Sequence, residues 1–408
     1  MIFFCTRRLP RRLIILGSTG SIGTQAVEVV NHLNVLHRRG EFPFEYRVVG
    51  LAAGRNAALA FEQAATLGVR HIALADRGGA GVSAPEDTVI FSGSNAAETL
   101  VREVECDLVL AAIVGVAGLP ATLAAVELGR DVALANKETL VAAGGLIIPT
   151  AMRSGSKLLP VDSEHAGVWR CLLGAMDRTT SFSPPLRCGP EVARITLTAS
   201  GGPFRTWTRE AIQSATPAQT LRHPTWVMGP KVTVDSASLM NKALELIEAH
   251  WLFGIGADRL NAVIHPQSIV HALVEQADGS VIAHLAAPDM RSPIHAALAW
   301  PHHAPSCAAR LTINQFSRLE FEEIDTRRFP AIGCAHEIIR RSGRGGTVLN
   351  AANETVVQAY LQNRISFGMA QNLVTEALEC IPEGPQDTLE QVLECNDRTS
   401  AWVLARCR

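Results

Sequence analysis

The sequence predicts an α/β protein with three parts: a doubly wound parallel sheet, a central α+β domain and a C-terminal helical domain. In the first third of the chain, short apolar runs alternate with helical segments. After about residue 160 the runs are strand-like and end in glycines or surround a turn. From about residue 325 the pattern is that of amphipathic helices, as in 350–365.

Length and composition limit the classes of protein that need to be considered. A chain of 408 residues is too long for one core. Its 47% hydrophobic and 19% charged residues are typical of a folded protein, and a net charge of −2 argues against a nucleic-acid partner. Nine scattered cysteines without a CxxC pair indicate free thiols in a reducing compartment.

The N-terminal part contains the strands of the predicted parallel sheet. They are expected at 12–17, 46–54, 71–76, 107–115 and 131–136, and a helix at 21–33 follows the first. The apolar stretch 108–129 is long enough to span a bilayer, but Gly115, Gly118 and Pro120 divide it. We therefore predict a strand, a loop and a helix there, and no membrane partner.

The later parts set the domain boundaries. A strand at 193–202 ends in glycines, two strands at 269–286 surround an Asp278-Gly279 turn, and 300–313 has a linker composition. We expect domains at 1–161, 162–299 and 325–408, with a linker at 300–324. The first residues, up to about 11, are expected to form a short disordered arm because they lack the long apolar region of a signal peptide.

A glycine-rich loop, GSTGSIG at 17–23, follows the first predicted strand and opens the first helix. Glycines let the backbone approach a pyrophosphate, and the helix N-terminus offers free N–H groups. The position between strand and helix therefore favours a Rossmann-like nucleotide site over a tight turn without a ligand.

The end of the second strand bears on the choice of cofactor. NAD-binding sheets usually place an acid there for the ribose hydroxyls, but the strand ends in Ala53, Gly54, Arg55 and Asn56. Arg55 could pair with a 2′-phosphate, which favours NADP(H). The alternative for Arg55 is a solvated loop charge.

Two carboxylates flank a serine at the end of an apolar run. Asp162 and Glu164 are two residues apart, so on an extended segment they point the same way. Neighbouring carboxylates repel unless a proton or a cation lies between them. Oxygen ligands suit Mg²⁺ or Mn²⁺, which would need a third ligand or substrate oxygens.

The segment 234–254 offers that third ligand on a predicted helix, 237–252. Its polar arc carries Asn241, Lys242, Glu245 and Glu248, opposite a broad apolar side, and Ser236 lies just before the helix. Such side chains at a helix start suit an anionic ligand, and Glu245 could reach a metal beside it. The alternative is a surface helix with charge pairs, in which Glu245 and Glu248 are interchangeable.

These motifs occur together in an order typical of one family. The chain contains GSTGSIG, AAGRN, LANKETL, PVDSEH, TASGGPF, RHPTWVMG, DSASLMNKALE, IHPQS, PDMR and LNAANE. Over about residues 12 to 400 it resembles the 1-deoxy-D-xylulose 5-phosphate reductoisomerases. The resemblance implies conversion of that sugar phosphate to 2-C-methyl-D-erythritol 4-phosphate in non-mevalonate isoprenoid biosynthesis. A metal-assisted retro-aldol and aldol rearrangement would precede hydride transfer from NADPH.

The resemblance also implies roles for individual residues. Metal ligands fall on Asp162, Glu164 and Glu245, and the catalytic residues are Lys137, Glu164 and His223. NADPH contacts fall on Thr19, Gly20, Ser21, Ile22, Gly54, Arg55, Asn56, Asn136, Glu138 and Gly229. Substrate contacts fall on Lys137, Ser163, Glu164, Ser200, His223, Trp226, Ser236, Asn241, Lys242 and Glu245. The segment from about 223 to 229 resembles the family's mobile lid.

Further expectations follow from the family. They are Mg²⁺, Mn²⁺ or Co²⁺ as the divalent cation, a homodimer, and the bacterial cytoplasm rather than a plastid stroma. Two alternatives are a metal-assisted NADP dehydrogenase acting on another sugar phosphate or hydroxy acid, and a non-catalytic NADPH-binding protein. The complete acidic triad and the NKALE phosphate site argue against the first, and the presence of all three acids and of Lys137 argues against the second.

Overall fold

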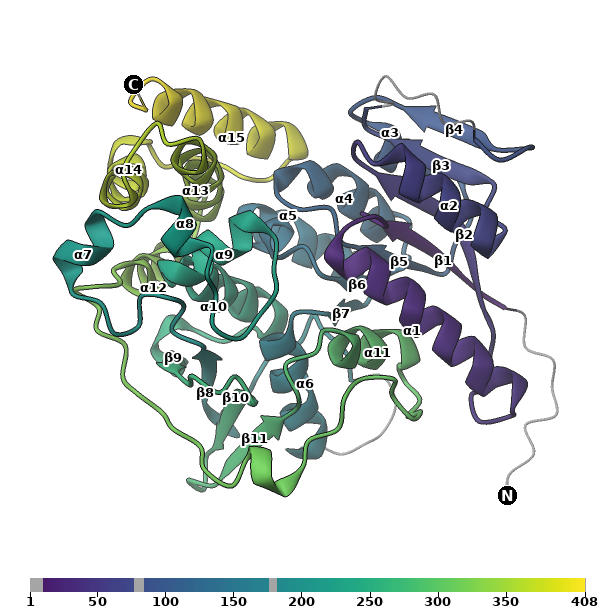
Figure 1. Cartoon of the computed structure of the whole chain (residues 1–408), viewed down its shortest axis with the longest axis horizontal. Helices are drawn as coiled ribbons and strands as arrows, with labels where there is room; N and C mark the ends of the chain where they lie inside the picture. The colour runs from purple at the N-terminus through teal and green to yellow at the C-terminus, as the bar shows by residue number, and fades with distance from the viewer. Residues whose placement is uncertain (1–9, 77–83, 176–181, 408) are drawn as a thin grey trace. The chain divides into compact units, whose positions relative to one another are not determined.

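The computed structural model describes residues 10–76, 84–175 and 182–407 (Figure 1). The chain divides into two compact units. The first unit comprises Met1–Asn136, Pro149–Ala166 and Asp289–Ala309. The second comprises Lys137–Ile148, Gly167–Pro288 and Arg310–Arg408. Because the chain passes between the units several times, segments far apart in sequence share one core.

The first unit is built on a parallel sheet of seven strands in the order β4-β3-β2-β1-β5-β6-β7. The strands are β1 (Arg11–Leu16), β2 (Tyr46–Ala53), β3 (His71–Leu74), β4 (Val89–Ser92), β5 (Leu108–Ala111), β6 (Asp131–Leu134) and β7 (Leu158–Pro160). The strand order reverses between β1 and β5, which in doubly wound sheets marks the ligand crevice. The predicted fold class is thus confirmed.

Helices cover both faces of this sheet (Figure 1). The unit holds α1 (Ser21–Arg38), α2 (Ala57–Leu67), α3 (Ala96–Glu103), α4 (Leu119–Glu127) and α11 (Arg291–Ala299). Helix α11 comes from late in the sequence and packs against α1. The Tyr46 hydroxyl donates to the Leu298 carbonyl at 2.5 Å, and burial raises the pKa of Tyr46 to about 12. This contact fixes the late segment to the second strand.

The long apolar stretch 108–129 forms a strand, a 3₁₀ turn at Val116–Gly118 and helix α4, as predicted. Pro120 stands in the first turn of that helix, where its missing N–H costs nothing. Within the described ranges, no helix combines the length and the apolar character needed to cross a bilayer.

The second unit is built on a mixed sheet of four strands in the order β11-β10-β8-β9. Strand β10 (Val270–Gln276) is antiparallel to β11 (Val281–Leu285) and to β8 (Val192–Ala199), whereas β9 (Leu260–Ile264) is parallel to β8. The predicted pair of strands around Asp278 and Gly279 is confirmed, and Gly279 adopts φ +85° in the turn.

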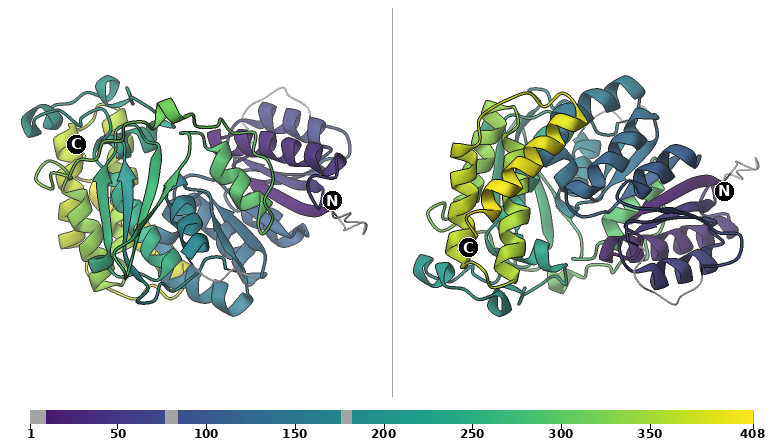
Figure 2. Two further views of the ribbon diagram at one scale, coloured as in Figure 1. Left: turned by 90° about the horizontal axis from the view of Figure 1, so that it is seen from below. Right: turned by 90° about the horizontal axis from the view of Figure 1, so that it is seen from above.

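The second unit also holds helices, and the late C-terminal ones lie beside its sheet (Figure 2). They are α7 (Arg209–Gln213), α8 (Pro217–Thr220), α9 (Pro230–Ala237), α10 (Met240–Phe253), α12 (Ala331–Arg341), α13 (Gly345–Leu361), α14 (Phe367–Cys380) and α15 (Leu389–Leu404). Two helices, α5 (Lys137–Ser154) and α6 (Ser163–Ala175), contribute residues to both units. The predicted C-terminal helical region is therefore present.

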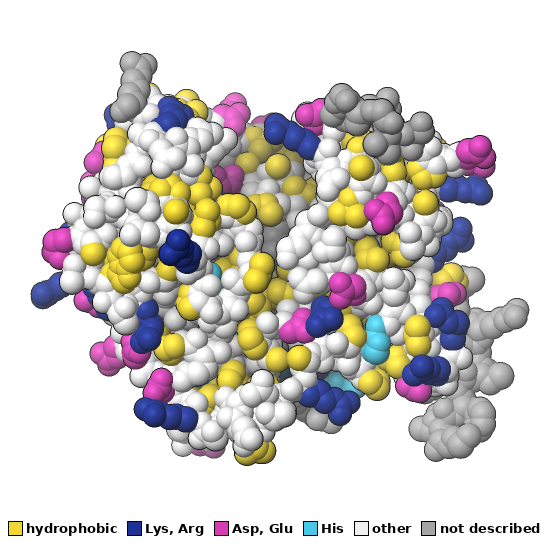
Figure 3. All heavy atoms as spheres, in the orientation of Figure 1, with side chains coloured by type: hydrophobic (Ala, Val, Ile, Leu, Met, Phe, Trp, Pro, Cys, Tyr) yellow, Lys and Arg dark blue, Asp and Glu magenta, His cyan; other side chains and the backbone are white. Residues whose placement is uncertain are grey.

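The face drawn in Figure 3 mixes basic, acidic and hydrophobic side chains without a large area of one sign. This mixture agrees with the net charge of −2. The cysteines among the described residues are free thiols, as expected.

Candidate active site

The glycine loop joins β1 to α1 and has the backbone that its sequence predicts. Gly17 adopts φ +80°, and a Cβ there would lie 2.5 Å from the Ala112 carbonyl oxygen. A Cβ on Gly23 would lie 2.2 Å from the Gly17 carbonyl oxygen, so neither position has room for a side chain. Gly20 and Ser21 are exposed at the N-terminus of α1, and no side chain caps that helix. Its N–H groups are therefore available to an anion.

The end of β2 exposes Gly54, Arg55 and Asn56. Asn56 caps α2 by accepting from the Leu59 amide at 3.2 Å. The Arg55 guanidinium lies 3.6 Å from Asp76, which follows β3. Because this pair is exposed, its contribution to stability is small, and Arg55 can exchange Asp76 for a stronger anion such as a phosphate.

Asn136 ends the first continuous part of this unit, directly after β6. Its side-chain amide donates to the carbonyl oxygens of Ile113 and, at 2.9 Å, Gly115. Gly118 leaves space for this amide, because a Cβ there would lie 2.9 Å from Nδ2. The loop after β5 is thus shaped around a buried asparagine that the sequence placed near the nicotinamide.

The acidic pair is arranged differently from the expectation. Asp162 and Glu164 do not lie on an extended segment, because α6 begins at Ser163 and Glu164 is in its first turn. The Asp162 carboxylate accepts from the Glu164 amide at 3.2 Å, which is helix-capping geometry. The two carboxylates still lie together, with one oxygen of each within 4.8 Å. The Ser163 hydroxyl donates to Glu164, so the three residues form one polar group.

The helix expected at 237–252 is present, but it begins three residues later and a separate helix precedes it. Helix α9 ends at Ala237, α10 begins at Met240, and Leu239 between them adopts φ +58°. Ser236 therefore lies in the last turn of one helix, and not just before the start of the other. The glycines that end β8 make room for it: a Cβ on Gly202 would lie 2.6 Å from the Ser236 carbonyl oxygen.

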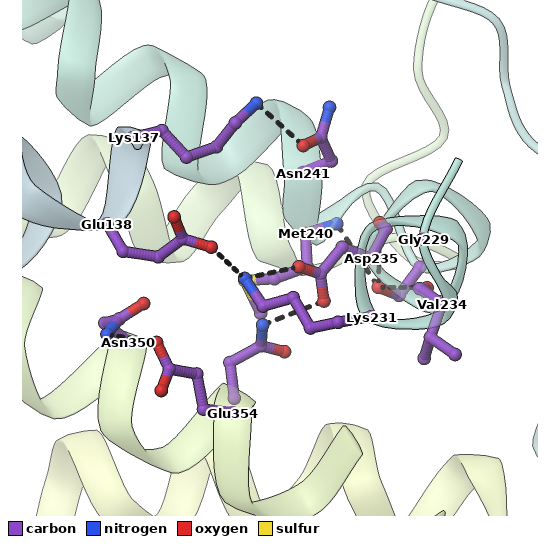
Figure 4. A network of polar contacts seen from close by, with 12 residues as sticks. Lys137, Glu138, Gly229, Lys231, Val234, Asp235, Met240, Asn241, Asn350 and Glu354 are labelled. Atoms are coloured by element: carbon purple, nitrogen blue, oxygen red, sulfur yellow. Dashed lines mark hydrogen bonds and ion pairs between the residues drawn. The ribbon is translucent and has the colours of Figure 1, made fainter. Parts of the chain in front are cut away.

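The polar arc of α10 is buried, which excludes the surface-helix alternative. Lys242, Glu245 and Glu248 are each at most 2% exposed. The Glu245 carboxylate accepts from Lys137 at 2.6 Å, from Asn241 at 2.5 Å, and from Lys242. Lys137 also donates to the Asn241 side-chain oxygen at 2.9 Å (Figure 4). Two ammonium groups and one side-chain amide therefore hold the Glu245 carboxylate in place.

His223 connects two serines that the sequence assigned to the substrate. Its Nε2 lies 2.9 Å from the Ser200 hydroxyl and 3.1 Å from the Ser236 hydroxyl. Its Nδ1 accepts backbone N–H groups from Thr225 and Trp226, at 3.1 and 2.9 Å. In the neutral ring the proton is thus on Nε2. Burial lowers the pKa of His223 to about 4, which keeps the ring neutral at pH 7.

The segment 223–229 has no regular secondary structure, as expected for a lid. Val227 is 98% exposed, although it is an apolar residue. The Trp226 ring is tilted toward His271, with ring centroids 6.4 Å apart. Gly229 ends the segment as the N-cap of α9. A segment with so few packing contacts can move at low energetic cost.

Sequence reasoning selected Glu138 but missed its partner. Glu138 is buried in the first turn of α5, and Lys231 donates to it at 2.6 Å (Figure 4). Burial by itself raises the pKa of Glu138, but the charge of Lys231 more than offsets this and the net pKa is lowered. Lys231 follows Pro230 in a motif that gave no signal in the sequence beyond a single basic residue.

The first unit has the sheet order and glycine loop of nicotinamide-dependent oxidoreductases, and the second collects buried cationic, hydroxyl and carboxylate groups suited to a small anionic substrate. These features define an NADPH-dependent oxidoreductase of the α/β class.

Family comparisons identify the particular family. Residues 13–144 match the profile of 1-deoxy-D-xylulose 5-phosphate reductoisomerase. Residues 158–253 and 285–402 match two C-terminal domains of the same enzyme. The chain belongs to the 1-deoxy-D-xylulose 5-phosphate reductoisomerase family.

Relatives with this function match along almost the whole chain. The reductoisomerase of Mycobacterium avium is 45% identical over 400 residues, covering 97% of this chain and 91% of the relative. That of Rhodospirillum centenum is 44% identical over 387 residues, covering 94% and 90%.

Solved structures agree. The Zymomonas mobilis reductoisomerase in complex with NADPH has a TM-score of 0.83 and 35% identity, covering 98% of this chain and all of that one. A reductoisomerase in complex with NADPH, fosmidomycin and magnesium has a TM-score of 0.86 and 33% identity, covering 97% and 98%.

Proposed function

We propose that the chain converts 1-deoxy-D-xylulose 5-phosphate to 2-C-methyl-D-erythritol 4-phosphate in non-mevalonate isoprenoid biosynthesis. The reaction is a retro-aldol and aldol rearrangement followed by reduction of the resulting aldehyde. The observation that carries the proposal is the buried group around Glu245, in which two lysines and an asparagine meet one carboxylate. Burying charged groups of this kind carries a desolvation penalty, which a bound ligand can offset.

The NADPH site is proposed at the glycine loop and at the end of β2. The absence of room for side chains at Gly17 and Gly23 fits a loop whose backbone closely approaches a pyrophosphate. When bound, NADPH supplies the hydride. Thr19, Gly20, Ser21 and Ile22 then bind its phosphates, Gly54, Arg55 and Asn56 the adenosine end, and Asn136, Glu138 and Gly229 the nicotinamide half.

A divalent cation is proposed to bind Asp162, Glu164 and Glu245. The donor set fits, because carboxylate oxygens suit Mg²⁺, Mn²⁺ or Co²⁺, and those of Asp162 and Glu164 lie within 4.8 Å of each other. When bound, the cation supplies Lewis-acid catalysis at the substrate oxygens. His165 supports Asp162: its Nδ1 lies 3.4 Å from the Asp162 carboxylate, and its side chain is fully buried.

The substrate phosphate is proposed to bind Ser200, Ser236, Asn241 and Lys242, with His223 between the serines. The Nε2 of His223 lies within hydrogen-bond distance of both serine hydroxyls. A neutral His223 with its proton on Nε2 could donate this hydrogen bond to an anion instead. Ser163 and Trp226 complete the contacts. Binding energy from this remote group can close the lid 223–229 and exclude water.

The catalytic residues are proposed to be Lys137, Glu164 and His223. The Lys137 ammonium stabilises negative charge that develops on a substrate oxygen. Asn241 and Glu245 hold this ammonium in place at 2.9 and 2.6 Å. A fixed donor needs little reorganisation during the reaction, which lowers the barrier.

The finer organisation remains part of the proposal. We expect a homodimer. We also expect it to work in the bacterial cytoplasm, and the bacterial origin of the relatives supports this location. We propose four functional parts: a cofactor domain at 1–161, a catalytic domain at 162–299, a linker at 300–324 and a helical domain at 325–408.

One assay tests the proposal. Purified protein is mixed with 1-deoxy-D-xylulose 5-phosphate, NADPH and Mg²⁺ or Mn²⁺, and the fall in NADPH absorbance is followed. We expect oxidation that depends on the sugar phosphate and stops with a chelator. No oxidation with either cation would contradict the proposal, and equal rates with NADH would contradict the role of Arg55.

A further inference from the structure

The chain uses lysine very sparingly. It has four lysines and 33 arginines. Arginine serves even in partly buried ion pairs, such as Arg11 with Asp131 at 3.2 Å. Three of the four lysines, Lys137, Lys231 and Lys242, lie in the second unit with mostly buried side chains, whereas Lys157 is 41% exposed. Two of these three have roles in the proposed function, and Lys231 has none.

Lys231 links two separate segments of the second unit. Its Nζ lies 2.6 Å from Glu138 Oε1 on α5 and 2.9 Å from Asp235 Oδ2 on α9 (Figure 4). The other oxygen of Asp235 accepts from the side-chain amide of Asn353 on α13 at 2.8 Å. One ammonium thus lies between two buried carboxylates. A compact point charge suits this position better than a planar guanidinium.

Lys231 and Glu138 both stay ionised near neutral pH. Burial by itself lowers the pKa of Lys231, but Asp235 and Glu138 more than offset this effect and the net pKa is raised. The pKa of Glu138 is lowered in turn. Lys231 therefore keeps its proton throughout the neutral range, which suits a structural tie and not a proton donor.

Both partners of Lys231 adjoin residues of the proposed site. Glu138 follows Lys137, whose ammonium contacts Asn241 and Glu245. Asp235 precedes Ser236, whose hydroxyl faces His223. A shift of either carboxylate would therefore displace a catalytic lysine or a phosphate-binding serine.

We propose that Lys231 is a positioning residue, which holds the start of α5 against α9 so that Lys137 and Ser236 keep their relative placement. The inference rests on the proposed function. It predicts that the compact ammonium, and not only the positive charge, is required at this position.

The test compares Lys231→Arg and Lys231→Met with the same exchanges at Lys157. In Lys231→Arg we expect a folded protein with kcat lowered by about tenfold or more, because displacement of a reacting group by an ångström can cost about 100-fold. The KM for the sugar phosphate should rise, through Ser236. The pH profile of kcat should keep its shape, since Lys231 transfers no proton. Lys157→Arg and Lys157→Met should retain wild-type kcat and KM.

The outcomes separate this inference from the proposed function. An inactive wild-type protein contradicts the function, and the inference with it. An active wild type with Lys231→Arg within about twofold of its kcat and KM overturns the inference alone. So does a lower melting temperature without a change in kcat of the folded protein, an equal loss in Lys157→Arg, or an altered pH profile. Should Lys231→Met fail to fold, Lys231→Arg alone decides.

Discussion

The glycine loop of the first unit and the group around Glu245 in the second are two candidate sites that are built in different ways. The loop relies on backbone: Gly17 and Gly23 permit a close turn, and α1 presents free N–H groups. The second group relies on side chains: Lys137, Asn241 and Lys242 meet Glu245 from two helices.

The difference concerns how each site depends on the rest of the fold. A backbone site needs only a strand, a turn and a helix that are consecutive in sequence, and therefore tolerates changes elsewhere. A buried side-chain site needs distant segments in register, and each member leaves an unpaired charge when its partner is lost. Substitutions in the second group should therefore have the larger effects.

The largest expected effect is at Glu245. We expect Glu245→Gln to lower kcat/KM by more than about 100-fold, since even residues that only support metal ligands cost about 10–100-fold. Glu248→Gln, on the same helix and equally buried, should retain substantial activity. The measurement is steady-state kinetics over a range of Mg²⁺ and Mn²⁺ concentrations. Equal losses in the two variants would contradict the assignment of the metal ligand.

The next effect is at Gly23. Its added Cβ would meet the Gly17 carbonyl oxygen at 2.2 Å, so Gly23→Ala should cost about 1–3 kcal/mol of stability and weaken NADPH binding. Gly333→Ala is the control, because a Cβ there meets nothing within 4 Å and the residue is in α12. It should be neutral or stabilise by up to about 1 kcal/mol. Urea denaturation and NADPH fluorescence titration measure both, and wild-type affinity in Gly23→Ala would argue against a tight backbone site.

A smaller effect is expected at Arg55. Loss of a charged hydrogen bond to a 2′-phosphate is worth about 2 kcal/mol, or roughly 30-fold in NADPH affinity. We expect Arg55→Gln to weaken NADPH binding and leave NADH binding unchanged. Arg47→Gln, an exposed position on β2, the strand that precedes Arg55, should affect neither. If both cofactors weakened equally in Arg55→Gln, Arg55 would not recognise the 2′-phosphate.

The smallest effect is the pH dependence that His223 gives to stability. Its folded-state pKa of about 4 is below the ordinary value of 6.5, so the unfolded chain binds the proton more readily. The resulting stability is fully present above pH 6.5 and is lost as pH falls toward 4. Burial likewise lowers the pKa of His284 to about 4, so part of the dependence persists in His223→Gln. Urea midpoints at pH 7 and 4.5 should differ less in His223→Gln than in the wild type; equal differences would contradict the shift.

The fold was largely predictable because its signals are local. Each strand flanking β1 is a short apolar run, and the glycine loop indicates the first strand–helix unit. Strand β4 gave a weaker signal, since its four residues are partly exposed at the edge of the sheet. The break at Leu239 was not predictable, because leucine rarely adopts positive φ and the helical pattern continues across it.

By itself, the sequence determined the alternation of strands and helices in the first third of the chain, the backbone of the glycine loop and the identity of the polar residues. Apolar periodicity and glycine conformation act over a few neighbouring residues, so they can be recognised without the fold. Only the tertiary structure decided that the polar arc of α10 is buried, that Asp162 caps a helix, and that Lys231 joins α5 to α9. Burial and pairing depend on which distant segments meet, and Glu138 and Lys231 are too far apart in sequence for a local pattern to connect them.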